Sequence, residues 1–479
     1  MSKEIGITIS KEEDFSEWYT QVVLKAELID YAPVKGFIVL RPDGYALWEN
    51  IKNIADKKFK ETGHKNGFLP VLIPESLLSK EAHHFQGFKP EVFWVTHTGD
   101  NKLIERLAVR PTSETLAYEI FAKWIRSYRD LPLKLNFWNS ALRAEIKSTK
   151  PLIRNSEFLW QEGHTIHESR DEAEKEALMM LNIYREIIED YLAIPVIVGY
   201  KSDREKFVGA EYTLTLEALM PDGKALQMGT SHNLAQNFSK VFNIKFLNKD
   251  NEEVYAWQTS WGISWRLIGA IVMTHGDKHG LILPPKIAPL QVIIVPIYYK
   301  SKDKDIIMEK ARKVKDLLNT NSIRVEIDER EEYTPGYKFN HWEMKGIPLR
   351  IEIGPRDVNN KRVVISRRDT NEKYEINDEV ILMKVNELLE SIQNNLYNKA
   401  KMLLESNIHE VYNYEDMKSL IEKGGFIKAS WCGNEECEVR IKEEIGADIR
   451  VIPFNSHSNN NCIYCNGKGR HIAYFARAY

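Results

Sequence analysis

The chain has 479 residues, of which 43% are hydrophobic and 28% are charged, and its formal net charge is −3. This composition indicates a globular protein of roughly three domains and excludes a disordered chain. The N-terminal stretch is polar, and the longest apolar run, around Ile287–Tyr299, is shorter than the roughly 20 residues of a membrane span. We therefore expect a soluble, intracellular protein. The small negative charge does not exclude a nucleic acid partner, because binding can rest on a local basic face.

Residues 1–283 predict an α+β domain of antiparallel strands with flanking helices. Apolar residues at helical spacing predict a helix over 48–63, and the run Phe68–Ile73 predicts an edge strand because a central strand would not tolerate Pro70. A helix is expected to begin near Pro111. Two strands and a helix that begins with a capping box should follow, over Leu133–Glu145, Glu157–Glu168 and from Ser169 onward.

The pattern changes at the proline-containing stretch Leu283–Lys286, which predicts a linker. Residues 284–398 then alternate between strand-like and helix-like segments, which predicts a compact α/β domain. These segments are Val292–Tyr298, Ile306–Leu318, Ile323–Asp328, Tyr337–Lys345, Leu349–Ile353 and Arg362–Ser366. Residues 399–479 form a third unit, with a helical stretch at Met417–Lys423.

All four cysteines lie in this third unit, as Cys432-x4-Cys437 and Cys462-x2-Cys465. In a long intracellular chain such clustering favours metal binding over disulfides. Four thiolates in two close pairs suit a tetrahedral Zn²⁺ ion. The alternative is a set of four reduced core cysteines.

Two arginines and an aromatic ring near the first predicted strand pair suit a nucleotide. Alternation on a strand places Arg143 and Glu145 on one face, and Arg154 and Phe158 follow with the spacing Arg-x-x-x-Phe. A guanidinium group suits a phosphate, and an aromatic ring suits a purine face. A surface Arg–Glu pair beside a core phenylalanine would give the same pattern.

Small residues occupy every second position from Ser260 through Gly262 to Ser264, which leaves one strand face nearly bare. A bare face lets a ligand lie against the backbone, and Arg266 at the start of the next helix could hold a phosphate. A packed strand facing a bulky helix is the alternative.

Two further segments could line a pocket for a small zwitterion. Trp160, Glu162 and His164 share a strand face by their period of two, and they offer a ring, a carboxylate and an imidazole. The polar segment Gln227–His232, which includes Thr230, could line the same pocket or form a turn.

The order and spacing of these motifs resemble the class II aminoacyl-tRNA synthetase core. The stretches RPTSET (110–115), EFLWQEGH (157–164), GTSHNLAQNFSK (229–240), YTPGYKFNHWEMKG (333–346) and GPRD (354–357) are most similar to prolyl-tRNA synthetases of the archaeal and eukaryotic type. The resemblance runs from about residue 15 to Tyr479. It departs from the general class II pattern at Leu142, Arg154, Ser260, Ser264 and Trp265, residues that the prolyl branch tolerates.

The resemblance implies ATP-dependent attachment of L-proline to tRNA(Pro) through a prolyl-adenylate, with release of pyrophosphate and AMP. It implies ATP with Mg²⁺, a structural zinc ion, a homodimer and a cytoplasmic location. ATP is expected at Arg143, Glu145, Arg154, Phe158, Gln227, Thr230, Ser264 and Arg266, of which Arg143 and Arg266 are the catalytic residues. Proline is expected at Thr112, Glu114, Arg143, Trp160, Glu162, His164, His232, Ser260 and Gly262.

The resemblance also suggests contacts outside the active site. Anticodon contacts are expected at Lys345, Arg356 and Asp357, although a solvated charged face would look the same. An exposed Arg367–Arg368 pair could contact the tRNA backbone. Pro70 matches the family's dimer-interface proline, and Tyr479 matches a C-terminal tyrosine that folds toward the active site.

Three alternatives compete with this interpretation: a synthetase for another amino acid such as threonine, an inactive paralogue that only binds tRNA or protein, and a zinc-containing nucleic-acid-binding protein. The residues of the pocket disfavour the first, and the three phosphate-binding arginines disfavour the second. The third leaves the first 280 residues unexplained.

Overall fold

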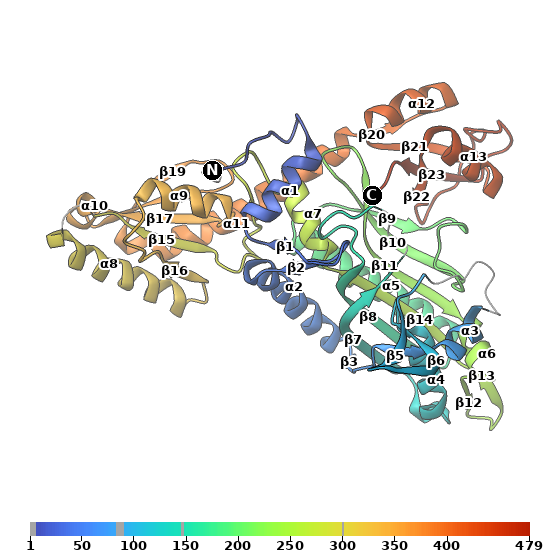
Figure 1. Cartoon of the computed structure of the whole chain (residues 1–479). Helices are drawn as coiled ribbons and strands as arrows, with labels where there is room; N and C mark the ends of the chain where they lie inside the picture. Colours follow the sequence, from blue (N-terminus) through green and yellow to red (C-terminus); the bar gives the residue numbers. More distant parts are fainter. Residues whose placement is uncertain (1–5, 83–90, 145–147, 299–300) are drawn as a thin grey trace.

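The structure is a computed structural model that describes residues 6–82, 91–144, 148–298 and 301–479. Three sheets organise it into three parts, spread across Figure 1 with the second part on the left, the third at the upper right and the first between and below them. None of the helices in the described ranges is both long and apolar enough to cross a membrane.

The first part is built on a seven-stranded sheet in the order β3-β7-β8-β14-β11-β10-β9. All neighbours are antiparallel except β3 and β7. This arrangement confirms the predicted α+β domain with an antiparallel sheet. Its strands are β3 (Lys65–Asn66), β7 (Leu133–Leu142), β8 (Glu157–His167), β9 (Ile197–Tyr200), β10 (Tyr212–Leu219), β11 (Ala225–Ala235) and β14 (Trp257–Ser264).

Helices cover one face of this sheet. The main core joins apolar residues of α1 (Phe15–Lys25), α2 (Pro42–Glu61), α5 (Arg170–Glu186) and α7 (Arg266–His275) to the sheet. Trp261 and Ile263 of β14 point into this core, so the even-numbered residues of the same strand face the other way. Ser169 caps α5 by accepting a hydrogen bond from the backbone N–H of Glu172, which is one half of the predicted capping box. The Glu172 carboxylate accepts from the Glu168 backbone N–H (3.1 Å) in place of that of Ser169.

Smaller elements complete the first part. They are β1 (Ile29–Tyr31), β2 (Ile38–Leu40), β4 (Leu72–Pro74), α3 (Glu75–Ala82), β5 (Trp94–Thr98), β6 (Asn101–Val109), α4 (Glu114–Trp124), α6 (Asn237–Phe242), β12 (Lys245–Leu247) and β13 (Glu253–Tyr255). Short 3-10 or π turns lie at Tyr128–Asp130 and Ile187–Tyr191 in this part, and at Asp378–Val380 in the second part.

Two expected strands end at different residues. The run Phe68–Ile73 pairs only from Leu72 onward, because the carbonyls of Leu69 and Pro70 instead accept hydrogen bonds from the Arg110 guanidinium (2.9 and 3.3 Å). The strand expected over Leu133–Glu145 ends at Leu142, and Glu145 itself lies outside the described residues.

The second part confirms the predicted α/β domain. Its five-stranded sheet has the order β16-β15-β17-β18-β19, with the first three strands parallel and the last two antiparallel. The elements are β15 (Val292–Pro296), α8 (Ser301–Thr320), β16 (Val325–Ile327), α9 (Pro335–Met344), β17 (Leu349–Ile353), α10 (Pro355–Asn359), β18 (Arg362–Arg367) and β19 (Lys373–Asn377).

The third part is a four-stranded sheet in the order β20-β21-β23-β22, with two helices. Its elements are β20 (Ile408–Glu410), α12 (Tyr414–Lys423), β21 (Phe426–Trp431), α13 (Glu435–Ile445), β22 (Asp448–Val451) and β23 (His471–Ala476).

A single helix, α11 (Ile381–Ser406), connects the second and third parts, so the boundary predicted between residues 398 and 399 falls inside a helix. The helix continues past residue 399 because its apolar side chains continue to pack on both sides of that position. Val385 and Ile392 pack against the five-stranded sheet, whereas Leu404 packs beside Phe426 of the four-stranded sheet.

Candidate active site

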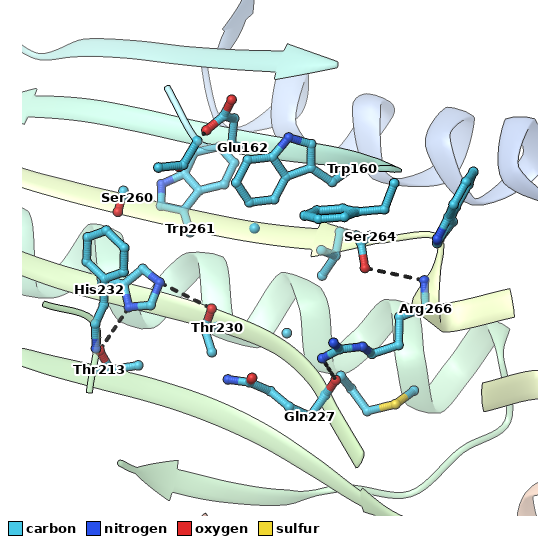
Figure 2. A pocket seen from close by; sticks show the side chains of 18 of the residues that line it. Trp160, Glu162, Thr213, Gln227, Thr230, His232, Ser260, Trp261, Ser264 and Arg266 are labelled. Carbon is cyan, nitrogen blue, oxygen red and sulfur yellow. Dashed lines mark hydrogen bonds between the residues drawn. The ribbon is translucent and has the colours of Figure 1, made fainter. Parts of the chain in front are cut away.

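A cavity of about 500 Å³ lies on the seven-stranded sheet, on the face that the helical core does not cover (Figure 2). Every residue predicted to bind ATP or proline lines it, except Glu145, which lies outside the described residues. The residues brought together are Thr112, Glu114, Arg143, Arg154, Phe158, Trp160, Glu162, His164, Gln227, Thr230, His232, Ser260, Gly262, Ser264 and Arg266.

The floor of the cavity is the bare face of β14, as the alternation of small residues predicted. A Cβ atom on Gly262 would lie 2.9 Å from the carbonyl oxygen of Gln161 and 3.7 Å from the Trp160 ring, so a larger residue would fill this part of the floor. Ser260 is 2% exposed, and its Oγ has no hydrogen-bond partner among the described residues. A ligand that reaches the floor could satisfy this hydroxyl group.

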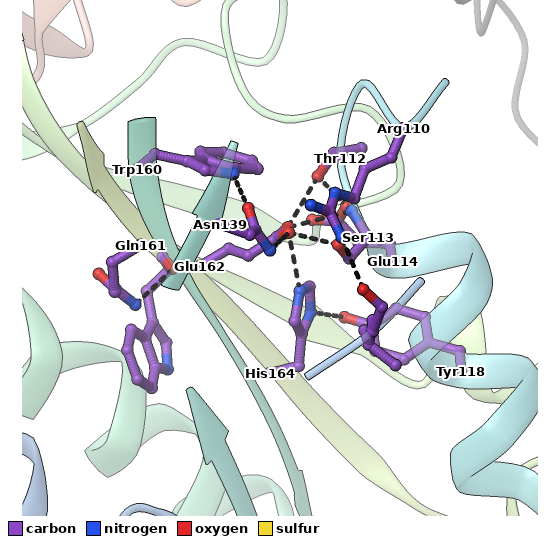
Figure 3. A network of polar contacts seen from close by, with 12 residues as sticks. Arg110, Thr112, Ser113, Glu114, Tyr118, Asn139, Trp160, Gln161, Glu162 and His164 are labelled. Atoms are coloured by element: carbon purple, nitrogen blue, oxygen red, sulfur yellow. Dashed lines mark hydrogen bonds and ion pairs between the residues drawn. The ribbon is translucent and has the colours of Figure 1, made fainter. Parts of the chain in front are cut away.

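One end of the cavity is built around the Glu162 carboxylate (Figure 3). It accepts hydrogen bonds from the Ser113 backbone N–H (3.0 Å), Asn139 Nδ2 (2.9 Å) and His164 Nε2 (3.3 Å). It also accepts one from the Ser113 hydroxyl. Thr112 Oγ1 lies 3.3 Å from it and donates a short hydrogen bond to Glu114.

The pKa values of the two carboxyl groups at the acidic end are shifted in opposite directions. Although burial opposes ionisation, hydrogen bonds from His164, Ser113 and Asn139 keep the pKa of Glu162 below its usual value. Burial raises the pKa of Glu114, against the effect of the His164 charge and with that of Glu162. Burial lowers the pKa of His164, but the hydrogen bond to Glu162 and the charges of Glu114 and Glu162 raise it above its usual value. Two carboxyl groups thus stabilise a positive charge at this place. This end therefore suits a small cationic amine.

Beside the acidic end, His232 and Phe207 form a less polar wall. Their rings lie 4.7 Å apart between centroids. His232 Nδ1 lies 2.9 Å from Thr213 Oγ1, and its Nε2 lies 3.2 Å from Thr230 Oγ1. Burial lowers the pKa of His232 to about 3, so the imidazole is neutral at physiological pH.

The opposite end of the cavity is cationic. Arg266 starts α7 and donates from Nη1 to the Gln227 carbonyl (3.3 Å). Burial and the neighbouring Arg143 charge lower its pKa to about 10, which still leaves it charged at pH 7. The Arg143 guanidinium lies 5.2 Å from the Phe158 ring centroid. Guanidinium groups beside an aromatic ring match the phosphates and base of a nucleotide.

Several lining residues were missed by sequence reasoning. Lys201, Glu205, Phe207 and Thr213 come from β10 and from the segment between β9 and β10, and Arg450 comes from the third part of the chain. Nothing in their local sequence patterns indicates a site. Outside the lining set, Asn139 carries a usable signal, because it pairs with Trp160 across the predicted strand pair.

The predicted anticodon residues lie in different surroundings. The Lys345 ammonium group forms ion pairs with Glu27 (2.5 Å) and Asp43, both from the first part of the chain. Lys345 therefore lies at the boundary between two domains. Asp357 accepts a hydrogen bond from the backbone at the start of α10. Arg356 is exposed.

The prediction that Arg367 and Arg368 are exposed is wrong. They are 7% and 3% exposed. Arg367 forms a bidentate pair with Asp369 (2.8 and 2.9 Å), and Arg368 forms one with Asp277 (2.6 and 2.8 Å). The two guanidinium groups are therefore part of the protein's own ion pairs.

The four cysteine sulfurs gather within 4.8 Å of one another. Cys432 Sγ lies 3.6 Å from Cys437 Sγ and 3.9 Å from Cys465 Sγ. A tetrahedral zinc ion with bonds of about 2.3 Å would hold its sulfurs about 3.8 Å apart. The two printed spacings are close to this value, so the cluster could hold such a metal ion.

Comparison with known proteins agrees with this geometry. The chain is 57% identical over 476 residues to the proline–tRNA ligase of Cenarchaeum symbiosum, which covers 99% of this chain and 100% of that protein. The chain belongs to the proline–tRNA ligase family. The family member of Alkaliphilus oremlandii is 53% identical and covers 98% of the chain and 97% of its own length.

The architecture also matches a solved proline–tRNA ligase. The crystal structure of prolyl-tRNA synthetase from Cryptosporidium parvum, complexed with halofuginone and AMPPNP, superposes with a TM-score of 0.95 at 42% identity and covers 99% of this chain and 100% of that one. The class II synthetase core domain (G, H, P, S and T) matches residues 93–275, the anticodon binding domain 291–395, and the prolyl-tRNA synthetase C-terminal domain 414–479. The three parts of the fold are thus the three domains of this ligase family.

Proposed function

We propose that this ligase activates proline at the cavity on the seven-stranded sheet and then transfers it to tRNA. The proline carboxylate attacks the α-phosphorus of ATP, and pyrophosphate leaves. A ribose hydroxyl of the terminal tRNA adenosine then attacks the carbonyl carbon of the adenylate, and AMP leaves. The observation that carries the proposal is the juxtaposition, in one cavity, of an acidic end suited to an amine and a cationic end suited to phosphates.

At the cationic end, Arg143 and Arg266 are the catalytic residues. Phosphoryl transfer requires in-line positioning and neutralisation of charge rather than a side-chain base. Arg143 contacts both the proline carboxylate and the α-phosphate, and Arg266 holds the far end of the triphosphate. Phe158 stacks on adenine. Mg²⁺ bound with ATP would neutralise charge on its phosphates. The remaining nucleotide contacts are Glu145, Arg154, Gln227, Thr230 and Ser264.

At the acidic end, the carboxylates of Glu114 and Glu162 bind the imino group of proline, and Trp160 and His232 enclose its ring. Thr112, His164, Ser260 and Gly262 complete this pocket. A smaller amino acid would lose apolar contacts worth only about 1–3 kcal/mol. We therefore expect some activation of alanine and cysteine.

The other domains serve the macromolecular substrate and the fold. The α/β domain contacts the anticodon, and the exposed Arg356 is the predicted residue best placed to do so. The cysteine cluster holds a structural zinc ion. Pro70 lies beside exposed apolar side chains of Phe68 and Val71, a surface that suits a homodimer interface. We place the enzyme in the cytoplasm, where tRNA is charged.

The test is ATP–pyrophosphate exchange with each of the twenty amino acids in turn. The expected result is exchange strongest with proline and abolished by Arg143→Ala. Exchange strongest with another amino acid would overturn the assignment of the proline pocket. No exchange with any amino acid, from folded and zinc-replete protein, would favour the inactive paralogue.

A further inference from the structure

A second charged cluster lies on the cavity wall, outside the predicted ATP and proline residues. Its centre is Glu217 of β10, which is fully buried. Glu217 accepts hydrogen bonds from Lys201 Nζ (2.7 Å) and from Nε and Nη2 of Arg450 (2.9–3.1 Å). Lys201 and Arg450 are 7% and 8% exposed, and both line the cavity. Three ionisable side chains are thus packed together beside the site for substrates.

Arg450 reaches the cavity from the C-terminal domain. It lies on β22, which runs beside the edge strand β9 of the catalytic sheet (Figure 1). Tyr200 and Ile452 exchange two backbone hydrogen bonds of 2.8 Å at this edge. Gly199 permits the close approach, because a Cβ atom there would lie 2.3 Å from the Ile452 carbonyl oxygen. The contact that delivers Arg450 is therefore a close backbone fit between two domains.

Two cationic side chains of the cluster keep donors that Glu217 does not use. The charges of Lys201 and Arg450 hold the pKa of Glu217 below its usual value, although burial opposes this. Glu205, which also lines the cavity, acts on both cations and raises the pKa of Arg450 together with Asp448. Lys201 Nζ makes its one hydrogen bond within the described residues to Glu217, which leaves further N–H groups for a ligand in the cavity. Arg450 donates to Glu217 through Nε and Nη2. Within the described residues its Nη1 group makes no such bond, so Nη1 can donate to a ligand.

The position of the cluster identifies the ligand. Glu217 pairs with Gln227 across β10 and β11, and the Gln227 carbonyl accepts the hydrogen bond from Arg266. Arg450 is also near enough to Arg266 for its charge to help lower the Arg266 pKa, after burial and Arg143. The cluster thus adjoins the end of the cavity that we assign to the nucleotide, not the amine-binding end.

We propose that Lys201 and Arg450 bind the phosphate tail of ATP, with Glu217 holding both side chains in place. The inference rests on the nucleotide site proposed above. It gives the C-terminal domain a direct part in substrate binding through Arg450, in addition to a structural zinc site. A planar guanidinium and an ammonium group are both suited to phosphate oxygens.

The experiment compares the affinities of ATP and AMP for the full chain, measured by isothermal titration with Mg²⁺ and without proline. Arg450→Met and Lys201→Met should each weaken ATP at least about tenfold, the loss of one charge-assisted hydrogen bond. AMP binding should change less than twofold, because AMP lacks the tail. Arg450→Lys should recover part of the ATP affinity.

Ser202→Ala is the matched control. It removes the Ser202–Glu438 hydrogen bond (2.6 Å), another contact between the same two domains, and Ser202 does not line the cavity. This variant should leave both affinities unchanged. Equal losses of ATP and AMP affinity in Arg450→Met, or a loss of thermal stability alone, would overturn the inference. Failure of the parent protein in proline-dependent exchange would instead reject the proposed function, because nucleotide binding is measured separately.

Discussion

Replacing Glu162 by glutamine should selectively weaken the use of proline. The substitution keeps the shape of the side chain and removes the charge that we assign to the imino group of proline. It also replaces one acceptor oxygen by an NH₂ donor in a place where the surrounding groups are already donors. The effect should therefore appear in the proline dependence of activation and not in ATP binding.

The contacts of the carboxylate set the magnitude. A glutamine that keeps its oxygen toward the Ser113 N–H and His164 must point its nitrogen at Asn139 Nδ2. Asn139 cannot turn over to accept, because its Oδ1 already accepts from Trp160 Nε1 (2.6 Å). The loss of the Asn139 hydrogen bond lowers the stability of the free enzyme, whereas the proline effect comes from the lost charge-assisted hydrogen bond between the imino group and the carboxylate, which is worth about 1.5–3 kcal/mol. The expected fall in kcat/KM for proline is about 10- to 150-fold.

The assay is ATP–pyrophosphate exchange at saturating ATP with proline varied, and thermal unfolding checks that the variant is folded. The matched control is Glu157→Gln, which makes the same substitution on the same strand at a residue that does not line the cavity. A Glu162→Gln enzyme whose kcat/KM for proline stays within about threefold of the parent would refute the reasoning.

Three further results are expected. Burial lowers the pKa of His275 to about 4, so between about pH 6.5 and 4 the unfolded chain takes up a proton that the folded chain does not, and stability falls as the pH falls. His275→Gln should make this fall in unfolding temperature shallower, and an unchanged slope would contradict the assignment. Arg368→Ala should cost about 1–3 kcal/mol by leaving Asp277 without its bidentate partner, and an unmoved denaturation midpoint would count against it. Zinc-supplemented parent protein should carry about one zinc ion per chain by atomic absorption, and Cys437→Ser should carry less. A parent protein without zinc would contradict the assignment.

The residues of the central strands could be predicted from the sequence because their period of two determines which side chains share a face. Trp160, Glu162 and His164 therefore appear together in the cavity, as do Ser260 and Gly262.

The remaining features depend on contacts between distant segments. Arg450 and Glu217 are 233 positions apart, and no periodicity within either strand records their pairing. The burial of Arg368 depends on its partner Asp277, which lies 91 positions earlier in the chain, because arginine is seldom fully buried without a partner. Such pairs are determined by how the domains dock, so they become visible only in the folded molecule.

The helix α11 makes the three domains mechanically dependent on one another. With 26 residues it is about 39 Å long. Near its middle, the Gln393 side chain donates to the carbonyls of Asp190 and Tyr191 in the catalytic domain (3.0 and 3.1 Å). These hydrogen bonds fix the middle of the helix to that domain. A tilt of about 5° about this point would shift each end in opposite directions by roughly 2 Å. Movement of the anticodon-binding domain would thus be passed through Leu404 to the sheet that carries Arg450.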